Sequence, residues 1–388
     1  MEKGGFYDVQ IEDGEGSISS EEFVNREWDE KGTGYQCIVV NGDLGTGKSI
    51  LSCRVAKRLL VRKRGDRTII FISARNQSKE MMEESRKFLN YFCKKVWRKR
   101  GKFIVIIDGW DELLESEVIK KSERIFEAAK HYKATLLISC RTAAMDKIYE
   151  IENAVDQSLK MKKLSKNTEK RSRKEERLFE NISKEVLSEA KAVPLFKKYI
   201  ETIVDREGNE ESDFLKNDYV FVRELYRIIC NREEEKYDSY RTNKESMECN
   251  FKIIAKNICK YGERPFTLDS CIQNEKDTYR ELMEISFYKE MISMEKSKDV
   301  LIVKGFKYRM FWRFFLAEEL YDRLQGDENE LISFLQLNWK SNEFANMKEG
   351  MLKSVPADKS INIRKKLKDT LNNNEDVRIE IENILEVL

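Results

Sequence analysis

The chain has 388 residues, enough for two or three domains that each bury a core. Hydrophobic residues make up 40% and charged residues 37%, which predicts globular domains with heavily charged helix surfaces. Only three prolines and 17 glycines exclude a collagen-like or linker-dominated protein. The net charge of +2 offers no overall attraction for a polyanion, so we do not expect nucleic acid as a partner.

The sequence carries no pattern of a secreted or membrane protein. The residues after Met1 lack the apolar core of a signal peptide, and no stretch approaches the roughly 18 apolar residues of a membrane span. Eight scattered cysteines without a C-x-x-C pair, and a single histidine, argue against a zinc site and fit a reducing compartment. We therefore expect a cytoplasmic protein with no membrane partner.

Residues 1–35 are acidic and punctuated by glycine, which predicts a partly disordered leader with one short helix at 20–29. The apolar run that follows predicts a first strand at 36–41, and helical apolar spacing predicts a helix at 50–62. The segment between them is a complete G-x-x-x-x-G-K-S/T phosphate-binding loop (Walker A).

The phosphate loop is the most informative motif of the chain. Its backbone N–H groups and the following helix N-terminus would bind phosphate oxygens. Lys48 would reach the β- and γ-phosphates, and the Ser49 hydroxyl would bind Mg²⁺. The predicted nucleotide-binding residues here are Gly42, Asp43, Leu44, Gly45, Thr46, Gly47, Lys48 and Ser49.

Strands and helices then alternate. Further strands are expected at 68–73, 103–108, 135–140 and, more weakly, 158–164, with helices at 78–98 and 112–131 between them. Continuous apolar runs separated by helices are typical of a parallel sheet covered on both faces. The predicted fold class is α/β: a P-loop NTPase core at 36–165 with a five-stranded parallel sheet flanked by helices.

The strand at 103–108 ends in Asp108, the position of a Walker B aspartate that binds Mg²⁺ directly or through water. Gly109 then lets the chain bend, and Asp111 and Glu112 can return toward the γ-phosphate, where one would polarise the attacking water. The alternative is that both acids only cap the helix that begins at Leu113.

Arg141 follows the strand at 135–140, in the motif Ser139-Cys140-Arg141-Thr142. Ligands of this fold lie beyond the carboxyl ends of parallel strands, so Arg141 would sense the terminal phosphate. The alternative is a surface arginine paired with Asp146 or another acid.

From residue 166 the strand patterns give way to helices, including 181–189 and 192–204, with one strand-like run at 300–303. The segment 160–177 holds nine basic residues against three glutamates, and 94–102 is also basic. Both are interpreted as solvated surface, because aromatic interleaving and a known nucleic-acid module are missing.

The three nucleotide motifs together resemble a NACHT NTPase of the STAND class, found in animal immune receptors and bacterial anti-phage proteins. The form D-G-h-D-E-L is matched without gaps at 108–113. Val193-Pro194-Leu195 resembles the small-x-Pro-Leu element of the family's first helical domain. The segment 306–318 resembles the F-x-H-x-x-F-x-x-F-F-A-A pattern of its winged-helix domain.

The resemblance covers roughly 36–330 and implies a helical domain at 166–235, a winged-helix-like domain at 236–330 and a C-terminal helical segment at 331–388. It implies that Pro194 lies against the adenine of bound ATP or ADP. The family's histidine that touches the β-phosphate is Tyr308 here, a phenol that can donate one hydrogen bond without a positive charge.

Two further departures from the family concern neighbouring positions and domains. The usual proline after the sensor arginine is Thr142. An effector domain before the loop and a repeat array after residue 330 are implied by the family, and neither pattern occurs. Three interpretations stay open: a fragment, a degenerate member, or a core that works with separate effector or sensor proteins.

The leading hypothesis is a nucleotide-operated switch in innate immunity or defence, in which ATP–Mg²⁺ opens the domains and drives homo-oligomerisation. Hydrolysis would be slow and regulatory, so whether the chain is an enzyme is left open. The alternatives are an AAA+-like ATPase that acts on nucleic acid and, less favoured, a small-molecule P-loop kinase.

Overall fold

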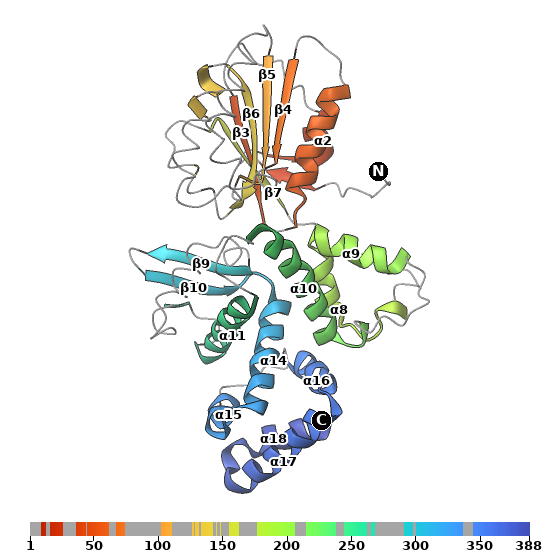
Figure 1. Ribbon diagram of the computed structural model, residues 1–388, viewed down its shortest axis with the longest axis vertical. Helices are drawn as coiled ribbons and strands as arrows, with labels where there is room; N and C mark the ends of the chain where they lie inside the picture. The colour runs from red at the N-terminus through yellow and green to blue at the C-terminus, as the bar shows by residue number, and fades with distance from the viewer. Residues whose placement is uncertain are drawn as a thin grey trace. The chain divides into compact units, whose positions relative to one another are not determined.

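A computed structural model gives the structure of the chain, in two compact units (Figure 1). The first unit comprises Met1–Asn167 and Lys191–Tyr199, and the second comprises Thr168–Ala190 and Ile200–Leu388. The structure describes residues 9–12, 16–25, 36–43, 45–61, 67–73, 102–110, 126–127, 129–131, 133–142, 145, 148, 155–162, 177–205, 215–237, 244–261, 265–267, 291–297, 300–336 and 344–388.

The first unit is built on a seven-stranded sheet with the order β2-β1-β7-β3-β6-β5-β4. The five strands from β7 to β4 are parallel, which confirms the predicted α/β class and parallel five-stranded core. The strands are β1 (Gln10–Glu12), β2 (Ser17–Ser19), β3 (Gln36–Gly42), β4 (Arg67–Ser73), β5 (Lys102–Asp108), β6 (Thr135–Arg141) and β7 (Gln157–Met161).

Helix α2 (Lys48–Val61) covers one face of this sheet (Figure 1). Its inner stripe of Leu51, Val55 and Leu59 packs on alternate residues of the central strands. The remaining strand residues, such as Val39 and Ile107, form a separate core on the opposite face. Each fully buried aliphatic side chain of this kind contributes about 1.5–3 kcal/mol, so continuous apolar strands fix the sheet between two layers.

The N-terminal segment contributes an antiparallel hairpin, β1 and β2, and a short helix, α1 (Ser20–Asn25). β1 pairs antiparallel with β7 and so extends the sheet beyond its parallel part. Ser19 and Glu22 form a capping box: Glu22 N–H donates to Ser19 Oγ at 3.0 Å, and Ser19 N–H donates to Glu22 Oε2 at 2.7 Å. The sequence interpretation of a loose leader missed these two strands.

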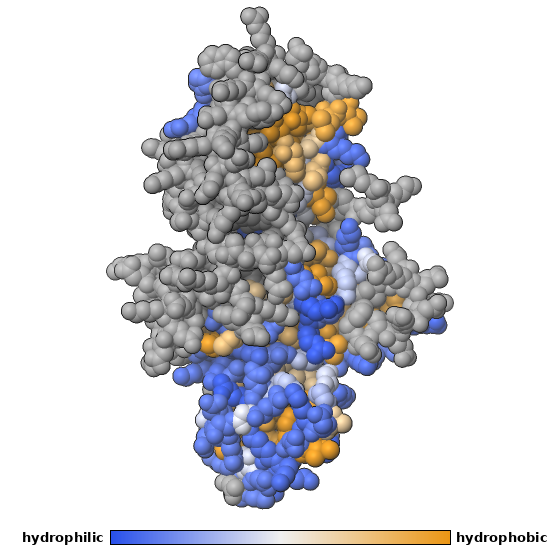
Figure 2. Space-filling model, viewed as in Figure 1, coloured by the Kyte–Doolittle hydropathy of each residue, from blue (hydrophilic) through white to orange (hydrophobic). Residues whose placement is uncertain are grey.

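Large apolar side chains of the described residues are exposed mainly on α2 and β4. Leu60 and Val61 at the end of α2 and Phe71 on β4 are exposed. Figure 2 shows an apolar surface in the region of α2 and β4. The helices near the C-terminus present a mainly hydrophilic surface in the same view.

The chain after the sheet is mostly helical. Its helices are α8 (Lys184–Lys191), α9 (Pro194–Asp205), α10 (Asp218–Tyr237), α11 (Lys244–Tyr261), α14 (Arg309–Gln325), α15 (Glu328–Leu335), α16 (Ala345–Lys353), α17 (Ala357–Asn373) and α18 (Arg378–Val387). The expected helices at 181–189 and 192–204 correspond to α8 and α9. The expected helix at 78–98 and most of that at 112–131 lie outside the described residues.

A small antiparallel sheet with the order β8-β10-β9 precedes α14. Its strands are β8 (Phe266–Thr267), β9 (Ile292–Ser297) and β10 (Val300–Phe306), the last of which contains the strand-like run seen in the sequence. The helix α14 buries an aromatic stripe: Phe315 stacks on Phe251 of α11 with ring centroids 4.8 Å apart and meets Tyr226 of α10 edge-on at 5.0 Å.

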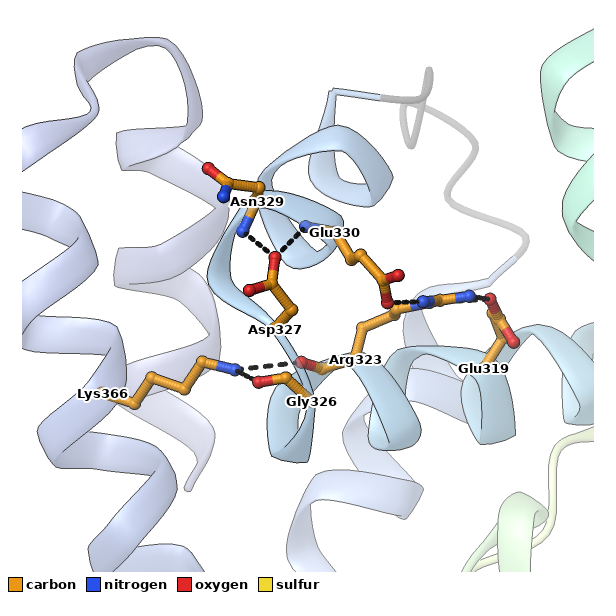
Figure 3. A network of polar contacts seen from close by, with 7 residues as sticks. All are labelled: Glu319, Arg323, Gly326, Asp327, Asn329, Glu330 and Lys366. Atoms are coloured by element: carbon orange, nitrogen blue, oxygen red, sulfur yellow. Dashed lines mark hydrogen bonds and ion pairs between the residues drawn. The ribbon is translucent and has the colours of Figure 1, made fainter.

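Polar contacts hold the end of α14 to α15 and α17 (Figure 3). Asp327 caps α15, because its Oδ1 accepts hydrogen bonds from the N–H groups of Asn329 and Glu330. The Lys366 ammonium of α17 donates to the carbonyl oxygen of Arg323 at 3.2 Å and to that of Gly326 at 2.5 Å, which satisfies the last turn of α14.

Candidate nucleotide site

The phosphate loop leaves β3 and enters α2 at the carboxyl edge of the parallel strands. Gly45 has φ = 74° and Gly47 has φ = 97°, in the left-handed region that favours glycine. A Cβ at Gly42 would lie 2.9 Å from Thr46 Oγ1 and 3.1 Å from the Cβ of Met161, so the loop also needs a glycine at its first position. Leu44 lies outside the described residues.

Lys48 lies across the loop that precedes it. Its Nζ donates hydrogen bonds to the carbonyl oxygens of Gly42 at 2.6 Å and Asp43 at 2.9 Å. Thr46 Oγ1 also donates to the Asp43 carbonyl, at 2.9 Å. The ammonium is therefore held over the loop where its backbone turns, and Ser49 follows it as an exposed residue in the first turn of α2.

Asp108 ends β5 and is only 9% exposed. Ser139 Oγ donates a hydrogen bond to Asp108 Oδ1 at 2.5 Å and accepts one from the Gly109 N–H at 3.0 Å. Among the residues that the structure describes, Asp108 forms no ion pair. The sequence analysis quoted Ser139 without a role. Its signal in the sequence was a hydroxyl directly after the apolar run Leu136-Leu137-Ile138 of the strand.

The strand order brings these motifs to one edge of the sheet. β6 lies between β3, which leads into the phosphate loop, and β5, which ends in Asp108. In the register of β3 and β6, Arg141 is directly opposite Gly42. Arg141 is 3% exposed, so it does not lie on the surface. Asp146, its alternative partner, lies outside the described residues, and the role of Arg141 toward phosphate stays a prediction.

One thiol of α2, that of Cys53, has a raised pKa. Burial raises the pKa of the Cys53 thiol above its usual value, and the negative charge of Asp108 raises it further. Cys53 lies one helical turn after Ser49.

The segment around Pro194 packs on the phosphate loop within the first unit. A Cβ at Gly45 would lie 2.9 Å from both Val193 Cγ1 and Leu195 Cβ. Pro194 is the first residue of α9, where its missing N–H costs no hydrogen bond. The predicted site residue Pro194 is thus beside the loop, and its contact with adenine stays a prediction.

The other three predicted residues belong to the second unit or lie outside the described residues. Tyr308 belongs to the second unit, where it is buried, precedes α14 and meets Phe311 edge-on at 5.9 Å. Asp111 and Glu112 lie outside the described residues. The roles of all three toward nucleotide stay predictions.

The donor set fits a nucleotide with Mg²⁺. Gly45 and Gly47 have the left-handed backbone of a glycine-rich loop, and Ser49 and Asp108 offer the hard oxygen ligands that Mg²⁺ prefers. A search of the described residues finds no cluster of three or more histidine, cysteine, aspartate or glutamate side chains that could hold a metal. One carboxylate and one hydroxyl suffice for Mg²⁺ only when substrate phosphates complete the coordination.

A strand, a glycine-rich loop, a helix and a strand-end aspartate in this arrangement form a P-loop NTPase fold. Within the described part of the chain, no helix is long and apolar enough to cross a membrane.

No family model and no curated protein matches the chain. Its similarity to solved structures is weak. The Orc1 protein of Aeropyrum pernix in complex with DNA is 14% identical with a TM-score of 0.39, over 73% of this chain and 87% of that chain. The replication initiator DnaA bound to AMPPCP and single-stranded DNA is 14% identical with a TM-score of 0.34, over 95% and 92%. RuvB of Thermotoga maritima is 14% identical with a TM-score of 0.36, over 69% and 84%.

The expectation that nucleic acid is not a partner is wrong as an exclusion, because these similar structures include complexes with DNA. The physical reason lies in the argument from net charge. A sum of +2 over 72 basic and 70 acidic residues does not describe the potential of any one face.

Proposed function

We propose that this chain is an ATP- and ADP-binding conformational switch of the NACHT type, whose nucleotide state controls the opening of its domains and their oligomerisation. The loop from Gly42 to Ser49 holds the phosphates, and Lys48 contacts the β- and γ-phosphates. Ser49 and Asp108 hold Mg²⁺, which supplies positive charge to the terminal phosphates.

The packing of Gly45 carries the proposal. A Cβ at this position would overlap Val193 and Leu195, so the loop backbone and the start of α9 are in direct contact. Any nucleotide that changes the loop changes what residues 193–195 can pack against. A switch requires that ATP and ADP differ in their affinity for two arrangements of the chain, and in this proposal the difference arises at this contact.

Helix α8 extends this connection into the second unit, since the chain passes between the units after Ala190. The Glu189 carboxylate accepts hydrogen bonds from the N–H groups of Arg309 at 2.8 Å and Met310 at 2.9 Å, in the first turn of α14. Glu185, one turn earlier, pairs with Arg313 at 3.0 Å. A short segment thus contacts the phosphate loop within one unit and α14 within the other.

Hydrolysis is a regulatory step in this proposal. Asp111 or Glu112 polarises the attacking water, and Arg141 senses the terminal phosphate. Pro194 contacts the adenine and Tyr308 the β-phosphate, as the family resemblance implies. The family also suggests a cytoplasmic role in innate immunity or defence, with separate effector or sensor proteins.

Size-exclusion chromatography with light scattering, run without nucleotide, with ADP and with ATP–Mg²⁺, tests the proposal. We expect a larger assembly with ATP–Mg²⁺ than with ADP, with little turnover. The same mass in all three conditions, together with no measurable nucleotide binding, would contradict it.

A nucleic-acid arm belongs in the same experiment, because nine basic residues lie in the segment 160–177. Fast ATP turnover that DNA or RNA stimulates, without a nucleotide-dependent change of mass, would favour an ATPase that acts on nucleic acid instead.

A further inference from the structure

A buried serine on β6 contacts both the strand-end aspartate and the turn that follows it. Ser139 is 2% exposed, and its hydroxyl makes two hydrogen bonds. It donates to Asp108 Oδ1 at 2.5 Å and accepts from the Gly109 N–H at 3.0 Å. One hydroxyl has one proton to donate, so this donor is fully committed to Asp108.

The strand register explains this contact. β5 and β6 are parallel neighbours in which Ile107 pairs with Ile138, and both side chains belong to the core on the face away from α2. Because side chains alternate along a strand, Asp108 and Ser139 point to the face that α2 covers. Cys53 of α2 senses the charge of Asp108, which agrees with this placement.

Asp108 therefore presents its two carboxylate oxygens to different surroundings. Oδ1 accepts the Ser139 proton, and no hydrogen bond to Oδ2 occurs within the described residues. A hydrogen bond to one oxygen restricts the rotation of the carboxyl group. Gly109, with φ = 77°, turns the chain directly afterwards, and its N–H is held by the same hydroxyl.

We propose that Ser139 is a positioning residue of the metal site: by holding Asp108 Oδ1 and the Gly109 N–H, it presents Oδ2 to the Mg²⁺ of a bound nucleotide. The inference rests on the proposed nucleotide site and adds a residue to it. Partners of metal ligands that orient them affect metal affinity by about 10- to 100-fold, so the effect is measurable without catalysis.

The test measures binding of a fluorescent ATP analogue in EDTA and during a Mg²⁺ titration, for four proteins. Ser139→Ala removes the hydroxyl, and Ser139→Thr keeps a hydroxyl on the same carbon. Ser158→Ala is the matched control, because Ser158 lies on β7 of the same sheet and accepts from Asn41 Nδ2 at 3.3 Å.

Ser139→Ala is expected to need about 10- to 100-fold more Mg²⁺ for half-maximal enhancement of binding. Its nucleotide affinity in EDTA is expected to stay within about twofold of wild type, a pattern that general loss of structure would not produce. Ser139→Thr and Ser158→Ala are expected to follow wild type. If the added methyl group of Ser139→Thr lowers the melting temperature, the Mg²⁺ requirements of Ser139→Ala and Ser158→Ala alone decide whether Ser139 positions Asp108.

A Mg²⁺ requirement of Ser139→Ala within twofold of wild type would overturn the positioning role and leave the nucleotide site standing. So would an equal loss in Ser139→Ala and Ser158→Ala. A wild-type protein that binds no nucleotide in either condition would instead overturn the proposed function, and this inference with it.

Discussion

Two buried carboxylates, one in each unit, have opposite surroundings. Glu319 on α14, with its side chain 8% exposed, accepts two hydrogen bonds from Arg323, from Nε at 2.9 Å and from Nη2 at 2.7 Å. Asp108 is buried to a similar degree and accepts a hydrogen bond from the neutral hydroxyl of Ser139. The first charge is neutralised by the protein itself, and the second has no cation among its described contacts.

This difference separates a structural network from a ligand site. Near Glu319, the carboxylate of Glu330 also pairs with Arg323 (Figure 3). Lys366 donates a hydrogen bond to the carbonyl oxygen of Arg323 at the end of α14. A buried charge without a counter-charge is unfavourable, so the Asp108 region gains most when a cation arrives. We propose that this cation is Mg²⁺, bound together with the phosphates of a nucleotide.

The largest effect is expected at the loop itself. Lys48→Ala should weaken ATP binding by about 100-fold, because a hydrogen bond between charged groups contributes about 1.5–3 kcal/mol. Lys57→Ala, an exposed lysine of the same helix, is the control and should bind as wild type does. Equilibrium dialysis with labelled ATP measures both. Equal affinities of the two variants for ATP would contradict phosphate binding by the loop.

Neutralising each carboxylate tests the comparison directly. Asp108→Asn should abolish the effect of Mg²⁺ on nucleotide binding and change the free energy of unfolding by less than about 1 kcal/mol, since no ion pair is broken. Glu319→Gln should lower the free energy of unfolding by about 2 kcal/mol, because Arg323 loses a charged acceptor, and leave nucleotide binding unchanged.

Urea unfolding gives the free energy of unfolding of both variants, and the Mg²⁺ titration gives the effect of Mg²⁺ on their nucleotide binding. If Asp108→Asn destabilises the fold as much as Glu319→Gln does, Asp108 belongs to a structural network and the distinction between the two regions fails.

A smaller effect is expected at the cap of α15. Asp327→Ala should lower the free energy of unfolding by about 1 kcal/mol, because the N–H groups of Asn329 and Glu330 lose their acceptor. Asp358→Ala removes an exposed acid from the first turn of α17 and serves as control. Nucleotide affinity should change in neither variant. An altered affinity in Asp327→Ala would show that this network is linked to the site.

The smallest effect is expected on the pKa of the Cys53 thiol. The pKa of Cys53 is raised by burial and then by the Asp108 charge, so Asp108→Asn should lower it. The pH profile of Cys53 alkylation, read by peptide mass spectrometry, would then move to lower pH. Glu12→Gln, a neutralised carboxylate on β1, should leave the profile in place. An unmoved profile in Asp108→Asn would separate Asp108 from α2.

The sequence predicted the parallel core well because each central strand is a continuous apolar run, such as Cys37 to Val40, and the Walker motifs mark the strand ends. It missed β1 and β2 because each is only three residues long and the acidic composition outweighed the buried Ile11. The capping-box pattern of Ser19 and Glu22 was the available signal.

Site residues that belong to one continuous motif could be predicted from the sequence. Contacts between segments that are distant in the sequence could not. Lys48 and Ser49 follow from the loop motif alone. The bond between Ser139 and Asp108 needs the order in which β6 adjoins β5, and the packing of Val193 on Gly45 needs the path of the chain into α9. Neither is encoded in a short motif. Net charge failed as an argument about nucleic acid because it averages over all faces.

The central claim is that nucleotide state and the start of α9 are coupled through Gly45. Its most direct test is the ratio of the dissociation constants for ADP and ATP–Mg²⁺ in wild type, Val193→Ala and Val186→Ala. Both substitutions truncate a buried valine, and of these two residues it is Val193 that lies against Gly45. We predict that the ratio moves toward one in Val193→Ala and stays at the wild-type value in Val186→Ala. The same ratio in all three proteins would contradict it.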